Sequence, residues 1–241
     1  MFEYPEYEWN VWRKLWHTIG CLLMLTIFYL WQSGPNPSQG LVFLVSFAWA
    51  ETGIAFAIDL IRFHSPRQNQ AVRNLPLFGK AMRQHEENCF NATTYYLLAS
   101  AILITAYRLN WCQGTTLVMA IAVLGIADPT AAWVRYQLHK HRLGYERPWG
   151  LIAFAIASFV VMWLVSWWHD HALDYQGLLA IGLIVALIES YTKDYVSLVR
   201  PLTRRLQHRL THSATVWLFR LYPDDNLVVP LAVAVLAGLI L

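Results

Sequence analysis

The chain has 241 residues, of which 57% are hydrophobic and only 14% are charged, and its net charge is +3. Soluble domains average about 25% charged residues, and here the apolar residues gather in long blocks. This composition excludes a disordered chain and an ordinary soluble enzyme. The three cysteines lie far apart, which argues against a zinc site and a disulfide-stapled module. We therefore interpret the chain as an integral membrane protein.

About 20 apolar residues in a helix are enough to cross the hydrocarbon core of a bilayer. The blocks predict an all-α fold, a polytopic transmembrane bundle of about seven helices that forms a single membrane domain over residues 1–241. The last two blocks are short, so either helix could tilt or stop partway. In chain order the predicted spans are 15–31, 40–61, 91–108, 114–133, 149–168, 176–192 and 227–241.

The basic residues predict the orientation of this bundle. Of the 18 Lys and Arg residues, all but Arg108 fall in segments 1–14, 62–90, 134–148 and 193–226. These four segments share one side of the membrane if every block crosses once. The positive-inside rule then makes the N-terminus and the basic loops cytoplasmic and puts the C-terminus on the opposite side.

One basic segment has a helical pattern of its own. Residues 191–222 form a predicted cytoplasmic insertion before the last helix, in which leucines recur at 202, 206 and 210 among basic residues. A cationic amphipathic helix beginning at Pro201 fits this pattern. It suits the inner headgroup layer, although a cap packed on other cytoplasmic loops fits equally well.

Ionisable residues inside apolar blocks cost about 2.5–3.5 kcal/mol each at mid-helix, so they are candidates for function. Glu51 and Asp59 are eight residues apart in the second block and lie broadly on one face of its helix. Other such residues come to the predicted cytoplasmic boundary of the bundle: His17, Asp128, Glu189, Asp224 and Asp225. The predicted topology therefore gathers a polar site at that boundary.

Several carboxylates at one level can hold a hard divalent cation such as Mg²⁺, which also bridges to phosphates. Nearby Arg13 and Lys14 can neutralise a phosphoryl group during its transfer. Simpler interpretations stay open, because a single carboxylate can pair with a basic neighbour and Arg13 and Lys14 can be topology anchors. Asp224 and Asp225 can likewise cap a helix.

Five short motifs follow one another along the chain. They are Arg-Lys-x-x-His at 13–17, Arg-x-x-Glu at 83–86 leading into Thr-Thr-Tyr at 93–95, Gly-x-x-Asp at 125–128, Ala-Leu-x-Glu at 186–189 and Asp-Asp-Asn-Leu-x-x-Pro-Leu at 224–231. Together they resemble the CTP-dependent lipid kinases, the family of dolichol kinase, phytol kinase and the fungal CTP-dependent diacylglycerol kinase. That family is distantly similar to phosphatidate cytidylyltransferase.

The resemblance implies phosphoryl transfer from CTP to the hydroxyl of a polyprenol, a phytol-like alcohol or a diacylglycerol at the cytoplasmic face. It implies Mg²⁺ or another divalent cation as cofactor. The partners would be the lipid alcohol and the bilayer, with no nucleic acid. The implied roles are catalytic for Asp128, Lys14 and Arg13, nucleotide-binding for Arg83, Arg135, Lys140 and Asn226, metal-binding for Asp128, Asp225 and Glu189, and supporting for His17 and Glu86.

Two other functions stay open. One is a phosphatidate cytidylyltransferase-like enzyme, which would release pyrophosphate rather than CDP. The other is a non-catalytic membrane protein that binds lipid or nucleotide, or a small transporter. Arg135 and His139 favour this last function, because they stand where the family has two glycines after its aspartate. Such glycines let backbone N–H groups approach phosphates closely.

Overall fold

The computed structural model describes residues 10–75, 79, 82, 89–141, 143, 145–170, 174–209 and 224–240, with backbone alone for 193–209. Arg83, Glu86 and the part of the predicted insertion beyond Arg209 therefore lie outside the described residues. The described residues form eight α-helices and no strand. This confirms the all-α prediction.

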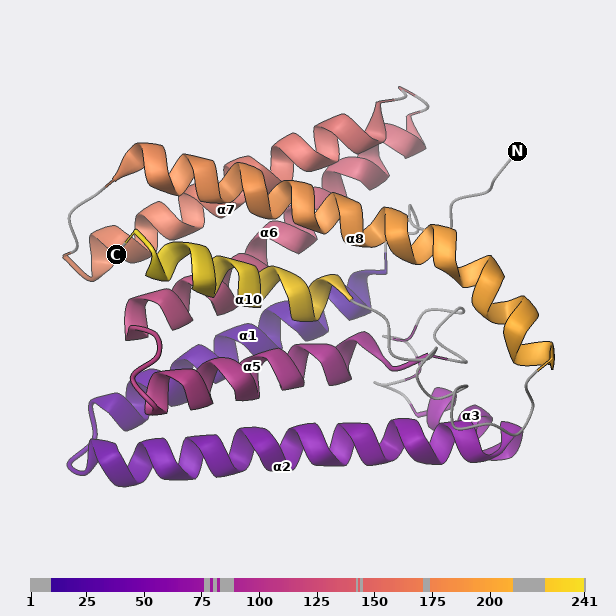
Figure 1. The fold of residues 1–241 in the computed structure, drawn as a ribbon, viewed down its shortest axis with the longest axis horizontal. Coiled ribbons are helices and arrows are strands. Elements are labelled where there is room, and N and C mark those ends of the chain that lie inside the picture. The colour runs from indigo at the N-terminus through magenta and orange to yellow at the C-terminus, as the bar shows by residue number, and fades with distance from the viewer. Residues whose placement is uncertain are drawn as a thin grey trace.

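The long helices run broadly side by side, with α2 at one edge of the bundle and α6, α7 and α8 towards the other (Figure 1). We call the end that holds Asn10, His64, Asn91 and Asp224 the polar end. The helices are α1 (Val11–Gln32), α2 (Pro37–His64), α3 (Pro66–Arg73), α5 (Ala92–Arg108), α6 (Gly114–Lys140), α7 (Glu146–Trp168), α8 (Tyr175–Arg209) and α10 (Asp225–Gly238).

Side chains with an oxygen acceptor begin three of the helices at the polar end. Asn10, Asn91 and Asp224 each accept a hydrogen bond from a backbone N–H in the first turn of α1, α5 and α10. Such caps satisfy donors that a helix leaves unpaired. Asp224 therefore has the capping role that the sequence left open.

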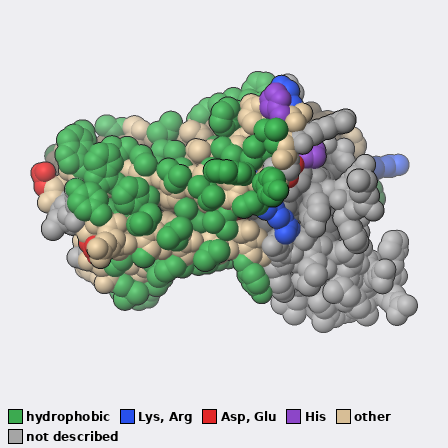
Figure 2. Space-filling view, turned by 90° about the horizontal axis from the view of Figure 1, so that it is seen from above, with side chains coloured by type: hydrophobic (Ala, Val, Ile, Leu, Met, Phe, Trp, Pro, Cys, Tyr) green, Lys and Arg blue, Asp and Glu red, His purple; other side chains and the backbone are tan. Residues whose placement is uncertain are grey.

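Five helices in the described part of the chain are long and apolar enough to cross a membrane: α1, α2, α6, α7 and the Tyr175–Thr192 part of α8. The third and seventh predicted spans form shorter helices, α5 with 17 residues and α10 with 14. Large apolar side chains such as Ile19, Phe43 and Ile54 are exposed on the bundle. Figure 2 shows hydrophobic side chains over most of the visible body, with charged ones at its ends. The chain is therefore a helical, membrane-embedded protein.

Helix α6 forms the centre of the bundle. In its most apolar 18-residue stretch 67% of residues are buried, against 22% in α1 and α2, and it packs on α1, α7 and α10. Small residues let the helices approach: a Cβ added at Gly125 would lie 2.7 Å from the Cβ of Cys21 in α1. The central position explains why Asp128, in the middle of α6, is buried among other helices.

Two helices continue beyond their predicted ends. Helix α6 runs through Pro129 to Lys140, and α8 runs through Pro201 to Arg209 without a break. A separate amphipathic helix beginning at Pro201 is therefore not what forms there. Proline inside a helix removes one hydrogen bond and commonly bends the helix rather than ending it. The last turns of α8 do bend, extending past the polar end and turning towards the level of α3 (Figure 1).

Candidate functional site

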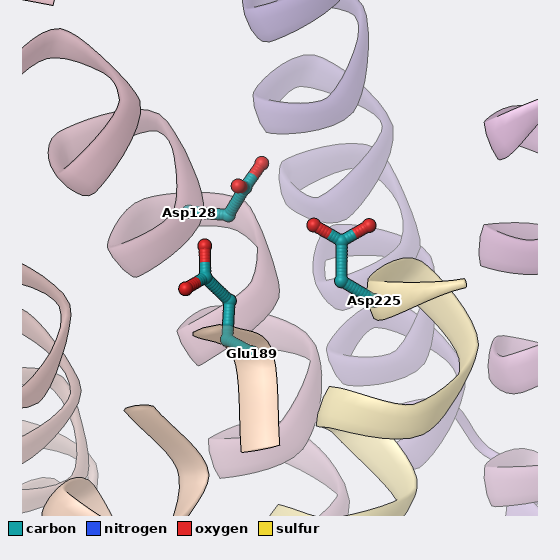
Figure 3. Close-up of side chains that lie close together, drawn as sticks. All are labelled: Asp128, Glu189 and Asp225. Atoms are coloured by element: carbon teal, nitrogen blue, oxygen red, sulfur yellow. The ribbon is translucent and has the colours of Figure 1, made fainter. Parts of the chain in front are cut away.

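Three carboxylates from three helices meet at the polar end. Asp128 of α6, Glu189 of α8 and Asp225 of α10 each have an oxygen within 4.8 Å of the others. Figure 3 shows the three side chains lying side by side, with the ribbon of α1 next to them. Asp128 and Glu189 are buried and Asp225 is half-buried. We call these three residues the acid cluster.

Two basic side chains pair with the acid cluster. Lys14 Nζ of α1 donates to Asp128 Oδ2 at 2.5 Å. The guanidinium of Arg135 donates from both terminal nitrogens to Glu189, at 3.0 Å and 2.8 Å. The two-pronged arrangement is the strongest geometry for an arginine and a carboxylate. Charge is thereby largely balanced, which is what burial at membrane depth requires.

The first turn of α10 adds Asn226 to the cluster. Asn226 is buried, and its side-chain amide donates to Asp224 and, at 3.2 Å, to Asp225 Oδ1. Burial, and then the neighbouring charge of Asp225, raises the pKa of the Asp224 carboxyl to about 7. Asn226 thus contacts both aspartates, and its implied nucleotide-binding role stays a prediction.

The helical repeat and one glycine bring Arg135 to Glu189. Arg135 lies seven residues after Asp128, about two turns along the same face of α6. Its side chain crosses Gly150 of α7, where an added Cβ would lie 2.8 Å from Arg135 Cδ. The sequence analysis assigned no role to Gly150, because only the arrangement of α6 on α7 reveals the close approach.

Two further predicted residues of α1 lie beside the acid cluster. Arg13 is buried, and its charge acts on Asp224 and on His17. His17 is buried against Tyr96 of α5, with ring centroids 6.2 Å apart, and it lies within electrostatic reach of Asp128 and Asp225. The structure therefore brings together these predicted site residues: Arg13, Lys14, His17, Asp128, Arg135, Glu189, Asp225 and Asn226.

Other predicted residues lie apart from this group. Lys140 is exposed in the last turn of α6. His139, which stands at a family glycine, is also exposed and lies 3.6 Å from Glu146. Glu51 is half-buried in α2 and is not part of the acid cluster. These positions leave Arg135 as the replacement that reaches the buried site.

A second buried group of charges joins α2 to α5. Asp59 pairs with Arg62 at 2.7 Å and accepts hydrogen bonds from the Asn91 backbone at 2.9 Å and the Thr94 hydroxyl at 2.6 Å. Arg62 also donates to the Cys89 carbonyl at 2.8 Å. We call Asp59, Arg62, Asn91 and Thr94 the α2–α5 latch. The sequence analysis missed it because Arg62 fell just outside the predicted span.

The chemistry of the acid cluster fits a hard divalent cation. Mg²⁺ takes carboxylate oxygens, usually from one or two protein residues, together with phosphate oxygens and water. Asp128, Glu189 and Asp225 offer such oxygens from three helices. Lys14 and Arg135, the cations now paired with two of these acids, are also groups that bind phosphate. The residues present therefore fit both a metal ion and an anionic phosphate chain.

Comparison of the chain with protein-family models, with curated proteins and with solved structures finds no match in any of the three.

Proposed function

We propose that this protein is a membrane enzyme that transfers a phosphoryl group from CTP to the hydroxyl of a lipid alcohol, with Mg²⁺ as cofactor. The observation that carries the proposal is the acid cluster, with Lys14 and Arg135 paired to two of its three carboxylates. Four of the five ordered motifs support it, because they contribute seven of the residues in this one group: Arg13, Lys14, His17, Asp128, Glu189, Asp225 and Asn226.

In the proposed reaction the ion pairs exchange partners. Without nucleotide, Lys14 neutralises Asp128 and Arg135 neutralises Glu189. When metal and nucleotide arrive together, the carboxylates would hold the cation while Lys14 and Arg135 turn to phosphate oxygens. The bound cation would supply positive charge against the charge that develops on the phosphates. Because both exchanges keep charge balanced, we expect metal and nucleotide to bind cooperatively.

Arg135 has a specific place in this proposal. Where the family has a glycine that opens backbone N–H groups to phosphates, this chain has a guanidinium with five N–H donors in a planar fork. That fork already reaches the acid cluster through Glu189. We propose that Arg135 contacts the phosphates directly and takes over what the glycine-rich backbone does in the family.

We further propose that all seven predicted spans cross the membrane, with the polar end cytoplasmic. Helices α5 and α10 are about 25 Å and 21 Å long at 1.5 Å per residue, less than the roughly 30 Å core. Both pack against other helices of the bundle, so they need not match the lipid by themselves.

Cysteine labelling tests the proposed topology. In a variant whose native cysteines are replaced by serine, Trp111→Cys should react with a membrane-impermeant maleimide on intact cells. Gln68→Cys should react only after permeabilisation. Both positions are exposed. Equal reactivity of the two would contradict a crossing by α5.

A second candidate function is non-catalytic binding of lipid or nucleotide. It is favoured by the two-pronged pair of Arg135 with Glu189. Such a pair is typical of a permanent structural contact, in which the guanidinium would not leave Glu189 to bind phosphate. The two functions differ in turnover: a binding protein would hold CTP with Mg²⁺ and release no product.

The experiment that tests the proposal uses the purified protein in detergent with Mg²⁺ and γ-labelled nucleoside triphosphates. Farnesol, phytol, dioctanoylglycerol and phosphatidate serve as acceptors. The proposal predicts labelled lipid phosphate and CDP from an alcohol, with CTP as the best donor. Release of pyrophosphate with phosphatidate would identify a cytidylyltransferase instead. Binding of CTP without any product would favour the non-catalytic function.

A further inference from the structure

His17 lies one helical turn beyond the ion pairs, on the side away from the polar end. It follows Lys14 by three residues on α1, which is about 4.5 Å further along the helix axis. Next to it, Thr18 donates to the Gly125 carbonyl of α6 at 2.9 Å, which fixes α1 against the central helix. Its neighbours Trp16 and Ile19 are exposed on the apolar surface. His17 therefore lies one turn deeper in the bundle than Lys14, buried beside Tyr96.

The imidazole of His17 is buried with an unsatisfied nitrogen. The residue is 1% exposed, and Nδ1 makes no hydrogen bond with any residue that the structure describes. Buried polar atoms in native proteins nearly always have a partner, because leaving one unpaired is costly. The His17 ring stacks on Tyr96, with planes 19° apart, and a ring stack cannot satisfy Nδ1. We therefore expect an atom of a bound ligand to be the hydrogen-bond partner of Nδ1.

The surroundings of His17 select the kind of partner. Arg13 and Lys14 act on it with positive charge and Asp128 and Asp225 with negative charge, while burial disfavours an imidazolium. A neutral imidazole has one donor and one acceptor nitrogen. A hydroxyl group can both donate and accept a hydrogen bond, so it suits Nδ1 in either tautomer. Mg²⁺ prefers oxygen ligands, so the imidazole is a poor ligand for the metal ion. An alcohol whose tail lies in the bilayer also brings its hydroxyl to this depth.

We propose that His17 Nδ1 binds the hydroxyl of the lipid alcohol and holds it next to the phosphate chain at the acid cluster. This inference rests on the proposed function and adds the acceptor side of the same site. His17 is thus a substrate-positioning residue, and its loss should affect the lipid and spare the nucleotide. Holding the two reactants in contact and in the right orientation supplies a large part of the rate enhancement of a two-substrate reaction.

The test compares His17→Leu and His17→Asn with the unchanged protein. Asn places an amide close to where Nδ1 lies, whereas Leu has no polar atom. Met24→Leu, a buried change two turns further along α1, serves as the matched control. For each protein we would measure the Kd for Mn²⁺ with CTP, the KM for CTP, the kcat/KM for farnesol and the thermal unfolding temperature.

For His17→Leu we expect kcat/KM for farnesol to fall about 100-fold while the Kd and KM for CTP change less than twofold. His17→Asn should keep a kcat/KM for farnesol of at least about a tenth of the value for the unchanged protein. Met24→Leu should match the unchanged protein. Normal farnesol phosphorylation by a folded His17→Leu would overturn the inference, as would CTP affinity falling in parallel or no recovery with Asn. If the unchanged protein neither binds CTP with Mn²⁺ nor phosphorylates any alcohol, the proposed function itself fails.

Discussion

The acid cluster and the α2–α5 latch are both buried groups of charge at the polar end, yet they are built differently. In the latch, a single carboxylate, Asp59, receives Arg62, a backbone N–H and a hydroxyl. In the acid cluster, three carboxylates crowd within 4.8 Å. The latch joins two helices, α2 and α5, while the cluster draws on three, α6, α8 and α10.

This difference separates a structural contact from a candidate site. The donors around Asp59 balance its one negative charge, so the latch gains nothing from a further ligand. Carboxylates held close together repel one another, and Lys14 pairs with Asp128 while Arg135 pairs with Glu189. Under the proposed function these cations would be exchanged for a metal ion, which carboxylate oxygens from three helices would hold.

The largest expected effect is the loss of activity in Asp128→Asn. Removing this carboxylate should lower the rate of lipid phosphorylation about 1,000-fold, because charge on the transferring group is no longer offset through the metal. Initial rates with labelled CTP and farnesol measure the effect. Activity that persists in the variant would remove Asp128 from the mechanism.

The corresponding change in the latch should act on stability instead. Asp59→Asn leaves the buried Arg62 without its counter-charge, and breaking a buried pair in this way costs about 3 kcal/mol. Thermal unfolding in detergent should show a clear decrease, while activity per folded molecule stays within about twofold. An Asp59→Asn protein that is stable but inactive would reverse the roles assigned to the two groups.

The sequence predicts the acid cluster better than the latch for a physical reason. Alternating apolar blocks bring the ends of distant helices to one side, so Asp128, Glu189 and Asp225 are expected at one level. The packing of α10 on α6 and α8 then brings them together. The pairing of Arg62 with Asp59 depends on where α2 ends, and the prediction ended that span at residue 61, whereas α2 runs to His64. An apolar run does not reveal how far its polar flank stays helical.

Other features follow from tertiary packing and have no sequence pattern. Arg135 reaches Glu189 because α7 presents Gly150 beneath its side chain, and residues 54 positions apart form that pair. The predicted phosphate role of Arg135 stays a prediction. Pro201 was a poor guide to the start of a separate helix, since α8 continues through it.

Gly150→Ala should disturb the acid cluster indirectly, by displacing the Arg135 side chain that pairs with Glu189. The added Cβ would overlap the Arg135 side chain, and overpacking of this kind costs about 2 kcal/mol. We expect a lower unfolding temperature and reduced affinity for CTP. Gly53→Ala is the matched control, because its Cβ would meet no atom within 4 Å and alanine favours a helix. Equal stability of the two variants would show that Arg135 is not held against Gly150.

The smallest expected effect is a gain. In Lys14→Gln the cation that competes for Asp128 is gone, so Mn²⁺ alone should bind about tenfold more tightly, a change of about 1.4 kcal/mol. The shift of the unfolding temperature on adding Mn²⁺ should accordingly be larger than in the unchanged protein. A smaller shift in Lys14→Gln would show that Lys14 supports the metal rather than competing with it.

Electron paramagnetic resonance of Mn²⁺ tests the central claim most directly, because it counts bound metal ions without requiring turnover. The unchanged protein and Asp59→Asn should each bind one Mn²⁺ per chain, more tightly with CTP present. Asp128→Asn should bind none over the same range. Equal Mn²⁺ binding in the two variants, or no saturable binding in the unchanged protein, would contradict the assignment of the acid cluster as a metal–nucleotide site.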